Sequence, residues 1–267
     1  MPHYFPITRE RHSQKYWLRP SSYAFAATSS VVQLVGAELP KLATVMPIAF
    51  VEQPSGFVPA AVLGLQPGKN LFVAPDGRWI GSYIPVAFRS HPFRLTEAEA
   101  GQQALCIDEE SGLLSDGPTG ERFFTEAGEA SQATLDVLSF LTQSERNRLV
   151  TAAACAVMQK HKLFCPWPIT LKAGDAERAL RGLFQVDEVA LNQLSAEALF
   201  EVRQAGALPM AYCQLLAMQH LPLLGRLSDA HGKAAKQAGA LPTQAAVSGL
   251  DDALFTRNET ISFAGLG

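Results

Sequence analysis

The sequence predicts an α+β fold in which a mostly antiparallel N-terminal sheet packs against a C-terminal helical region. Before residue 120, short runs rich in β-formers alternate with turns that contain Pro and Gly. After residue 120, apolar residues recur at helical spacing. The 267 residues, 48% of them hydrophobic, suffice for a core of ordinary size. We expect one domain over 1–267, with a β-rich half (1–120), a helical half (121–240) and a tail (241–267).

The β-rich half contains three apolar runs that we predict to be strands, at 46–51, 57–65 and 70–74. Residues 104–108 and 112–116 flank an Asp-Glu-Glu-Ser turn, which indicates a further hairpin. Within this half, 31–42 is interpreted as a short helix, because Val35, Leu39 and Leu42 follow helical spacing.

The helical half is predicted to contain helices at 134–141 and from Ser144 to a point before Pro166. Ser195 is expected to cap a helix over 196–204, which Gly206 terminates. A long helix should open at Pro209 and kink or end at Pro222. Residues 260–264 could form a strand that returns to the sheet or a docked tail.

Charge and composition exclude several classes of protein. The formal net charge of −3 comes from basic and acidic residues spread along the chain, which disfavours a nucleic-acid partner. No apolar run reaches the roughly 18 residues that span a bilayer. The N-terminal sequence has no secretory signal pattern. The four cysteines lack close pairing and suit reduced thiols. We therefore expect a cytoplasmic protein without a transmembrane segment.

Motifs of known chemistry are missing from the sequence. It has no Gly-x-Gly-x-x-Gly, Gly-x-Ser-x-Gly or His-Glu-x-x-His pattern. Residues 64–70 resemble a phosphate loop but are one residue short, so a hairpin turn is the preferred interpretation. The six histidines are dispersed, and each is expected at the surface or at a cap. We predict no metal and no organic cofactor.

Several segments together resemble one known family. They are Tyr23–Ala27, Pro47–Phe50, Asn70–Val73, Asp76–Trp79, Val186–Glu188 and Gly206–Leu216. On these segments the chain resembles the bacterial SapC family, from about Tyr23 to Leu227. The family is named for a surface-layer locus, and members are encoded beside uptake receptors and flavin-dependent halogenases. The resemblance implies an accessory role in such a system, but it carries no mechanism.

Seven polar or aromatic residues are candidates for ligand binding, and most have a structural alternative. Residues 76–79 could form a simple turn with Trp79 in the core, and Asp187 could cap a short helix. The candidates are Asp76, Arg78, Trp79, Tyr83, Arg89, Asp187 and Glu188.

Two hypotheses of function remain open. The first is a non-catalytic binding or accessory protein with a protein or peptide partner, favoured by the missing catalytic motifs. The alternative is an enzyme with a site where the sheet meets the helices, built from the candidates other than Trp79. Convergence of those residues in one cleft would favour the enzyme. The sequence does not predict an oligomeric state.

Overall fold

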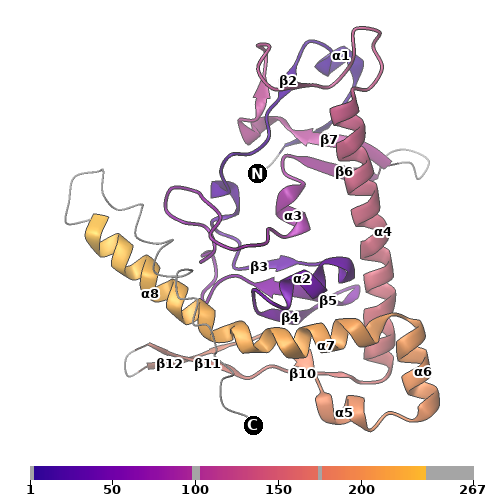
Figure 1. Cartoon of the computed structure of the whole chain (residues 1–267), viewed down its shortest axis with the longest axis vertical. Helices are drawn as coiled ribbons and strands as arrows, with labels where there is room; N and C mark the ends of the chain where they lie inside the picture. The colour runs from indigo at the N-terminus through magenta and orange to yellow at the C-terminus, as the bar shows by residue number, and fades with distance from the viewer. Residues whose placement is uncertain (1–2, 98–102, 174–175, 239–267) are drawn as a thin grey trace, which may run out of the picture.

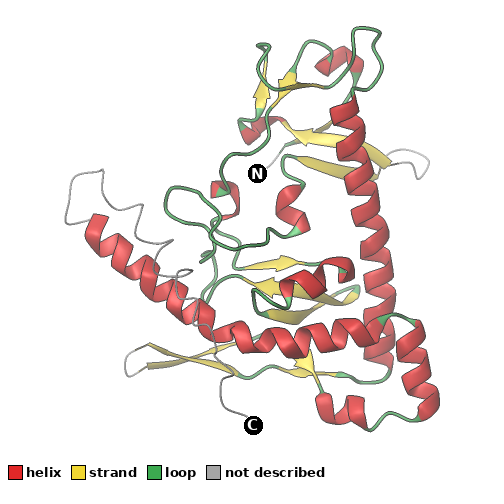
Figure 2. Ribbon diagram, in the orientation of Figure 1, coloured by secondary structure: helices red, strands yellow, loops and turns green. Residues whose placement is uncertain are grey.

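A computed structural model describes residues 3–97, 103–173 and 176–238. Figure 1 shows a five-stranded sheet in the lower part of the molecule and smaller sheets in the upper part, with the long helix α4 beside both. All paired strands are antiparallel. Helices dominate after α4 (Figure 2), so the predicted α+β class is confirmed.

The described elements are as follows. The strands are β1 (Tyr4–Pro6), β2 (Tyr16–Trp17), β3 (Val31–Gln33), β4 (Ile48–Gln53), β5 (Gly56–Val62), β6 (Phe93–Glu97), β7 (Gln103–Asp108), β8 (Leu114–Ser115), β9 (Glu121–Arg122), β10 (Phe164–Pro166), β11 (Ile169–Ala173), β12 (Ala176–Leu180) and β13 (Phe184–Val186). The α-helices are α1 (Arg9–His12), α2 (Leu39–Leu42), α3 (Val86–Arg89), α4 (Gln132–Lys160), α5 (Glu188–Asn192), α6 (Ala196–Gln204), α7 (Ala207–Ala217) and α8 (Leu221–Ala238).

The five-stranded sheet has the order β10-β13-β4-β5-β3. Its centre is the predicted hairpin β4–β5, which closes at Gly56 with a φ of 114°, a conformation that favours glycine. Strands β10 and β13 come from the second half of the chain, where no strand was predicted before residue 260. They escaped prediction because strands of three residues are too short to show an alternating pattern.

The described residues form two clusters of buried apolar side chains. The larger surrounds the five-stranded sheet and includes Phe50, Leu63 and Met158. The smaller lies among the upper sheets, β1-β7-β6 and β8-β2-β9, and includes Trp17 and Phe123. Helix α4 contributes Leu141 to the small cluster and Met158 to the large one, so it connects the two.

Helix α4 corrects the prediction of two separate helices. One continuous helix begins after Ser131, whose side chain accepts a hydrogen bond from the Thr134 amide, and runs to Lys160. The predicted hairpin between 104–108 and 112–116 is also wrong, because β7 pairs with β1 and β6, whereas β8 pairs with β2. Asp108 accepts from the Glu110 amide at 3.2 Å and starts a 3₁₀ turn that leads the chain to another sheet.

Two further N-terminal predictions need correction. Residues 31–33 form strand β3, so the predicted helix 31–42 is helical only from Gly36, as a 3₁₀ turn (Gly36–Glu38) followed by α2. Residues 70–74 are buried but form no ladder strand beyond an isolated bridge from Val73 to Trp79. Asn70 fixes this segment instead, since its side chain donates to the Ala26 carbonyl at 3.1 Å and accepts from the Phe72 amide at 2.9 Å.

The C-terminal helix boundaries follow the prediction closely. Gly206 has a φ of 71° and lies just beyond the end of α6. Helix α7 begins at Ala207, so Pro209 lies within its first turn rather than at its start, a small correction. A 3₁₀ turn at Met218–His220 separates α7 from α8, which places Pro222 in the first turn of α8. Residues 260–264 lie outside the described residues.

The caps of α5 and α6 give a direct test of local structure. Asp187 accepts from the Ala190 amide at 2.9 Å, and Ser195 accepts from the Ala198 amide at 3.2 Å. Asp187→Ala and Ser195→Ala should each lower the free energy of unfolding by about 0.5–2 kcal/mol, measured by urea denaturation. Glu188→Gln is the control and should be nearly silent, because Glu188 is an exposed side chain. Equal stability of all three variants would contradict the capping role.

Candidate functional site

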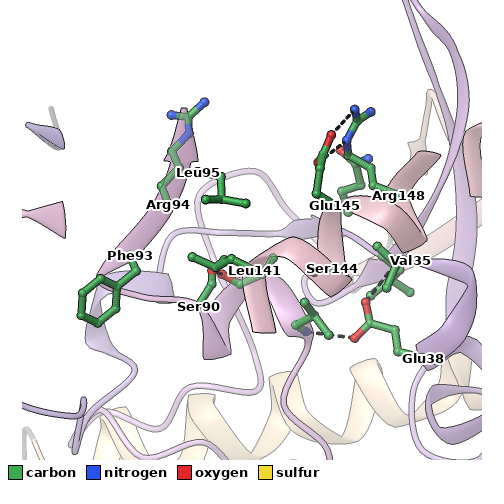
Figure 3. A pocket seen from close by; sticks show the side chains of 14 residues that line it. Val35, Glu38, Ser90, Phe93, Arg94, Leu95, Leu141, Ser144, Glu145 and Arg148 are labelled. Atoms are coloured by element: carbon green, nitrogen blue, oxygen red, sulfur yellow. Dashed lines mark hydrogen bonds and ion pairs between the residues drawn. The ribbon is translucent and has the colours of Figure 1, made fainter. Parts of the chain in front are cut away.

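An open cleft lies between the two parts of the molecule, where α4 passes β3, α3 and β6. We call it the α4 cleft, and its volume is about 370 Å³ (Figure 3). Its lining includes Gln33 on β3, Ala87 on α3, Leu95 on β6 and Arg148 on α4, together with Glu38. A second hollow of about 210 Å³ adjoins it and shares Glu38 with it. Charged side chains line both hollows: Glu38, Arg94, Glu145 and Arg148 in the cleft, and Lys41, Glu38 and Arg89 in the adjoining hollow.

Glu38 is the buried carboxylate of the cleft, with 3% of its surface exposed. Its Oε1 accepts from the Val35 amide at 3.0 Å, and its Oε2 accepts from the Val86 amide at 2.9 Å. The side chain therefore ties the segment after β3 to the first residue of α3. Burial raises the pKa of Glu38, although the two amide donors oppose this effect.

Tyr83 and Arg89 lie together beside Glu38. Arg89 Nη2 donates to the Tyr83 hydroxyl at 3.0 Å, and that hydroxyl donates to Glu38 Oε2 at 3.4 Å. The Arg89 guanidinium lies 5.4 Å from the centre of the Tyr83 ring and 5.3 Å from that of Phe140 on α4. Burial raises the pKa of Tyr83, so its hydroxyl stays protonated at neutral pH. Arg89 itself is exposed and adds positive charge to the adjoining hollow.

The rim of the cleft carries an ion pair, Glu145 with Arg148, and a further cation, Arg94. Arg148 forms two hydrogen bonds with Glu145, at 2.8 and 2.7 Å, one turn apart on α4. These bonds lower the pKa of Glu145 and raise that of Arg148. Figure 3 shows Arg94 on β6 across the cleft from this pair, and its guanidinium lies 5.5 Å from the Tyr4 ring centre. The rim is therefore cationic on the side of β6.

The structure divides the sequence-predicted candidates among separate places. Tyr83 and Arg89 border the hollow beside the cleft. Asp76 and Arg78 pair with each other at 2.8 Å in a turn, an arrangement that lowers the pKa of Asp76 mainly through the Arg78 hydrogen bond. Trp79 packs against the large core cluster.

Asp187 and Glu188 lie at the start of α5, far from α3 in Figure 1. The candidates named for an enzyme therefore do not converge in one cleft.

Sequence reasoning missed Glu38, Arg94 and Arg148. Glu38 had a usable signal, since it stands alone among the apolar residues Val35, Leu39 and Leu42, where a carboxylate must be buried and bound. Arg94 and Arg148 had none, because their importance comes from lying on opposite sides of a tertiary cleft.

Histidines and cysteines do not form a cluster in the described ranges. Within residues 3–97, 103–173 and 176–238, no group of three His, Cys, Asp or Glu side chains could hold a metal ion. His12 is fully buried, and its Nδ1 accepts from the Thr8 amide at 3.3 Å, so it supports the start of α1. Its Nε2 lies 3.2 Å from Glu109 Oε1 without hydrogen-bond geometry. Burial lowers the pKa of His12.

Stability should depend on pH through Glu38. Its folded-state pKa lies above the ordinary value of 4.5, so its stabilising contribution is complete below pH 4.5 and is lost as the pH rises through the raised pKa. Glu38→Gln cannot titrate. The substitution should lower the free energy of unfolding by about 1–3 kcal/mol at low pH. The side-chain NH₂ of the glutamine would face the N–H of either Val35 or Val86, which a carboxylate oxygen accepts in the parent.

Urea denaturation between about pH 4 and pH 7 measures this difference. The parent should lose stability relative to Glu38→Gln as the pH rises. Glu145→Gln is the matched control, because the lowered pKa of Glu145 gives a weak dependence of opposite sign. Parallel profiles for the parent and Glu38→Gln would contradict the assignment.

The fold and the cleft define an antiparallel α+β protein in which one long helix joins two cores beside an open cleft lined by apolar residues, two arginines and two glutamates. A comparison with family models gives its relationship. The SapC model matches residues 7–224, and the chain belongs to the SapC family. Neither the curated proteins nor the solved structures include a match. Among the described helices, none is both long and apolar enough to cross a membrane.

Proposed function

We propose that this chain is a non-catalytic binding protein that holds a protein or peptide partner in the α4 cleft. The separation of the candidate residues carries this proposal, because an enzyme of the predicted kind needs them in one place. The carboxylates of the cleft also support it. Glu38 is bound by two backbone amides and Glu145 by Arg148, so both have a structural task already.

The partner belongs, in this proposal, to a bacterial surface-layer, uptake or peptide-modification system in which the chain is an accessory component. Membership of the SapC family supports this assignment, through the locus for which the family is named and the genes beside its members. The formal net charge of −3 supports a protein or peptide over a nucleic acid.

The cytoplasm is the proposed location. All four cysteines are free, and Cys106 and Cys155 are buried. Burial raises the pKa of Cys155 to about 12, so this thiol is protonated and packs as an apolar group. Buried unpaired thiols suit a reducing compartment.

Selection from a random peptide library displayed on phage, against the immobilised full-length chain, tests the binding function. Selected peptides should bind the parent and lose binding to Ala87→Trp, which fills the cleft from the exposed face of α3. Ala153→Trp is the matched control, on an exposed position of α4 that does not line the cleft. Equal binding to both variants would reject the cleft. Chemical conversion of selected peptides would establish the enzyme alternative.

A further inference from the structure

Strand β3 has a free edge beside the α4 cleft. Within residues 3–97, 103–173 and 176–238, it is the last strand of its sheet and pairs with β5 alone. The Leu34 amide donates to Pro59 at 2.8 Å, and the Ser30 carbonyl accepts from Leu63 at 2.9 Å. Because bonding residues alternate in an antiparallel ladder, the N–H and C=O groups of Val31 and Gln33 point away from β5.

Strand β6 presents a second free edge to the same cleft. Among the described strands it is the last of β1-β7-β6, and the Pro92 carbonyl accepts from the Asp108 amide at 2.9 Å. By the same alternation, the backbone groups of Leu95 point away from β7. Gln33 and Leu95 both line the α4 cleft. In Figure 1, β3 and β6 lie below and above α3, both beside α4.

Glu38 limits the free edge of β3. The next outward donor along the chain is the Val35 amide, which Glu38 Oε1 already binds at 3.0 Å. Proteins commonly close or shorten exposed edges because unpaired strands attract other chains. Here the closure stops at Val35 and leaves Val31–Gln33 available, with Val31 39% exposed.

Charge around the cleft favours an acidic partner. The α4 cleft and the adjoining hollow are lined by Lys41, Arg89, Arg94 and Arg148, against the carboxylates of Glu38 and Glu145. Within the described part of the chain, the first three of these cations have no carboxylate oxygen within 4.0 Å. The two carboxylates, in contrast, are already bound.

We propose that the partner enters the α4 cleft as an extended acidic peptide that pairs, as an added strand, with the free edge of β3. This inference rests on the binding function proposed above. The backbone groups of Val31 and Gln33 would bond to the main chain of the peptide. Arg94 and its neighbouring cations would pair with its carboxylates, and alternate apolar side chains would pack on Leu95 and Leu141.

Three fluorescein-labelled peptides of about ten residues test this inference by fluorescence anisotropy with the full-length chain. The first alternates Glu with Val. The second replaces each Glu by Lys, which reverses the charge. The third is the acidic peptide with N-methyl groups on every second residue, which removes backbone donors but keeps all side chains. Only the first should bind appreciably, with the other two at least about tenfold weaker.

Two variants locate the contact on the protein. Gln33→Pro removes an outward N–H from the edge strand, where proline is tolerated, and should weaken binding of the acidic peptide about tenfold. Its control is Gln132→Pro at the first residue of α4, a position that also accepts proline. Arg94→Gln should weaken binding about threefold to tenfold, whereas Arg203→Gln on α6 should not.

The outcomes separate this inference from the proposed binding function. If the N-methylated peptide binds as tightly as the unmethylated acidic peptide, and Ala87→Trp abolishes that binding, the cleft is the binding site but strand pairing is overturned. Binding that ignores Gln33→Pro, Arg94→Gln and Ala87→Trp would overturn both.

A dimer in sedimentation that Gln33→Pro dissociates would assign the edge to a second copy of the chain. If the acidic peptide binds only to a chain that ends at residue 238, residues 239–267 occupy the edge of β3 in the full-length chain. Either result would overturn the proposal of an acidic partner.

Discussion

Division of the chain at residue 120 should leave neither fragment with a native fold. The five-stranded sheet takes β3, β4 and β5 from the first fragment and β10 and β13 from the second. Phe57 stacks on Phe164 with ring centres 4.3 Å apart, and Phe50 lies 4.6 Å from the same ring. Each fragment would therefore expose the apolar surface that its partner covers.

Gln214 adds a polar link between the same two fragments. It is fully buried; its Oε1 accepts from the Val186 amide at 2.9 Å, and its Nε2 donates to the Ile48 carbonyl at 3.3 Å. Separation would remove the Ile48 contact and expose this polar network.

Circular dichroism and hydrogen exchange measure the result on purified 1–120 and 121–267. Both fragments should show little cooperative unfolding and weak amide protection, because each lacks part of the shared core. Mixing the two is the internal control and should restore part of the native signal. Two separately cooperative, protected fragments would contradict the single domain and establish two independent folding units.

Trp79→Ala should cost about 3 kcal/mol or more of stability. The indole stacks on Phe72 with ring centres 5.6 Å apart and meets the edge of Phe88 at 5.7 Å. Its Nε1 donates to the Tyr83 carbonyl at 2.9 Å, so the side chain also holds the loop that leads to α3. Removal of the partly buried indole takes away its contacts with Phe72 and Phe88 and leaves the Tyr83 carbonyl without this donor.

Urea denaturation compares this variant with Phe200→Ala, an aromatic truncation on the exposed face of α6. Phe200 is 55% exposed, so its removal should change stability by less than about 0.5 kcal/mol. An unchanged denaturation midpoint for Trp79→Ala would contradict the structural role. Trp79 would then become a surface residue available for recognition.

Local features of this protein were predictable because they depend on residues close together in the sequence. The β4–β5 hairpin follows from two apolar runs around Gly56. The caps at Asp187 and Ser195 each bond to an amide three residues ahead, a distance that sequence patterns report directly. The resemblance to the SapC family likewise needed only sequence, and the family match confirms it.

The candidate site required long-range information. Asp76, Arg78, Asp187 and Glu188 looked reactive as sequence, but none of the four lines the cleft. Asp76 pairs with Arg78, and Asp187 caps α5. Tyr83 and Arg89 lie beside it because long-range contacts position their segment, among them the bond from the Val86 amide to Glu38 at the start of α3.

The sequence by itself determined the α+β class, the family, the helix caps and the central hairpin. Only the tertiary structure decided which strands complete the sheet, which edges stay free and which charges face one another across the α4 cleft. The physical reason is that hydrogen-bond register and burial join segments far apart in the chain. Glu38 and Val86 are 48 residues apart, and Gln214 and Ile48 are 166 apart. Pairings over such distances leave no periodic signal in the sequence.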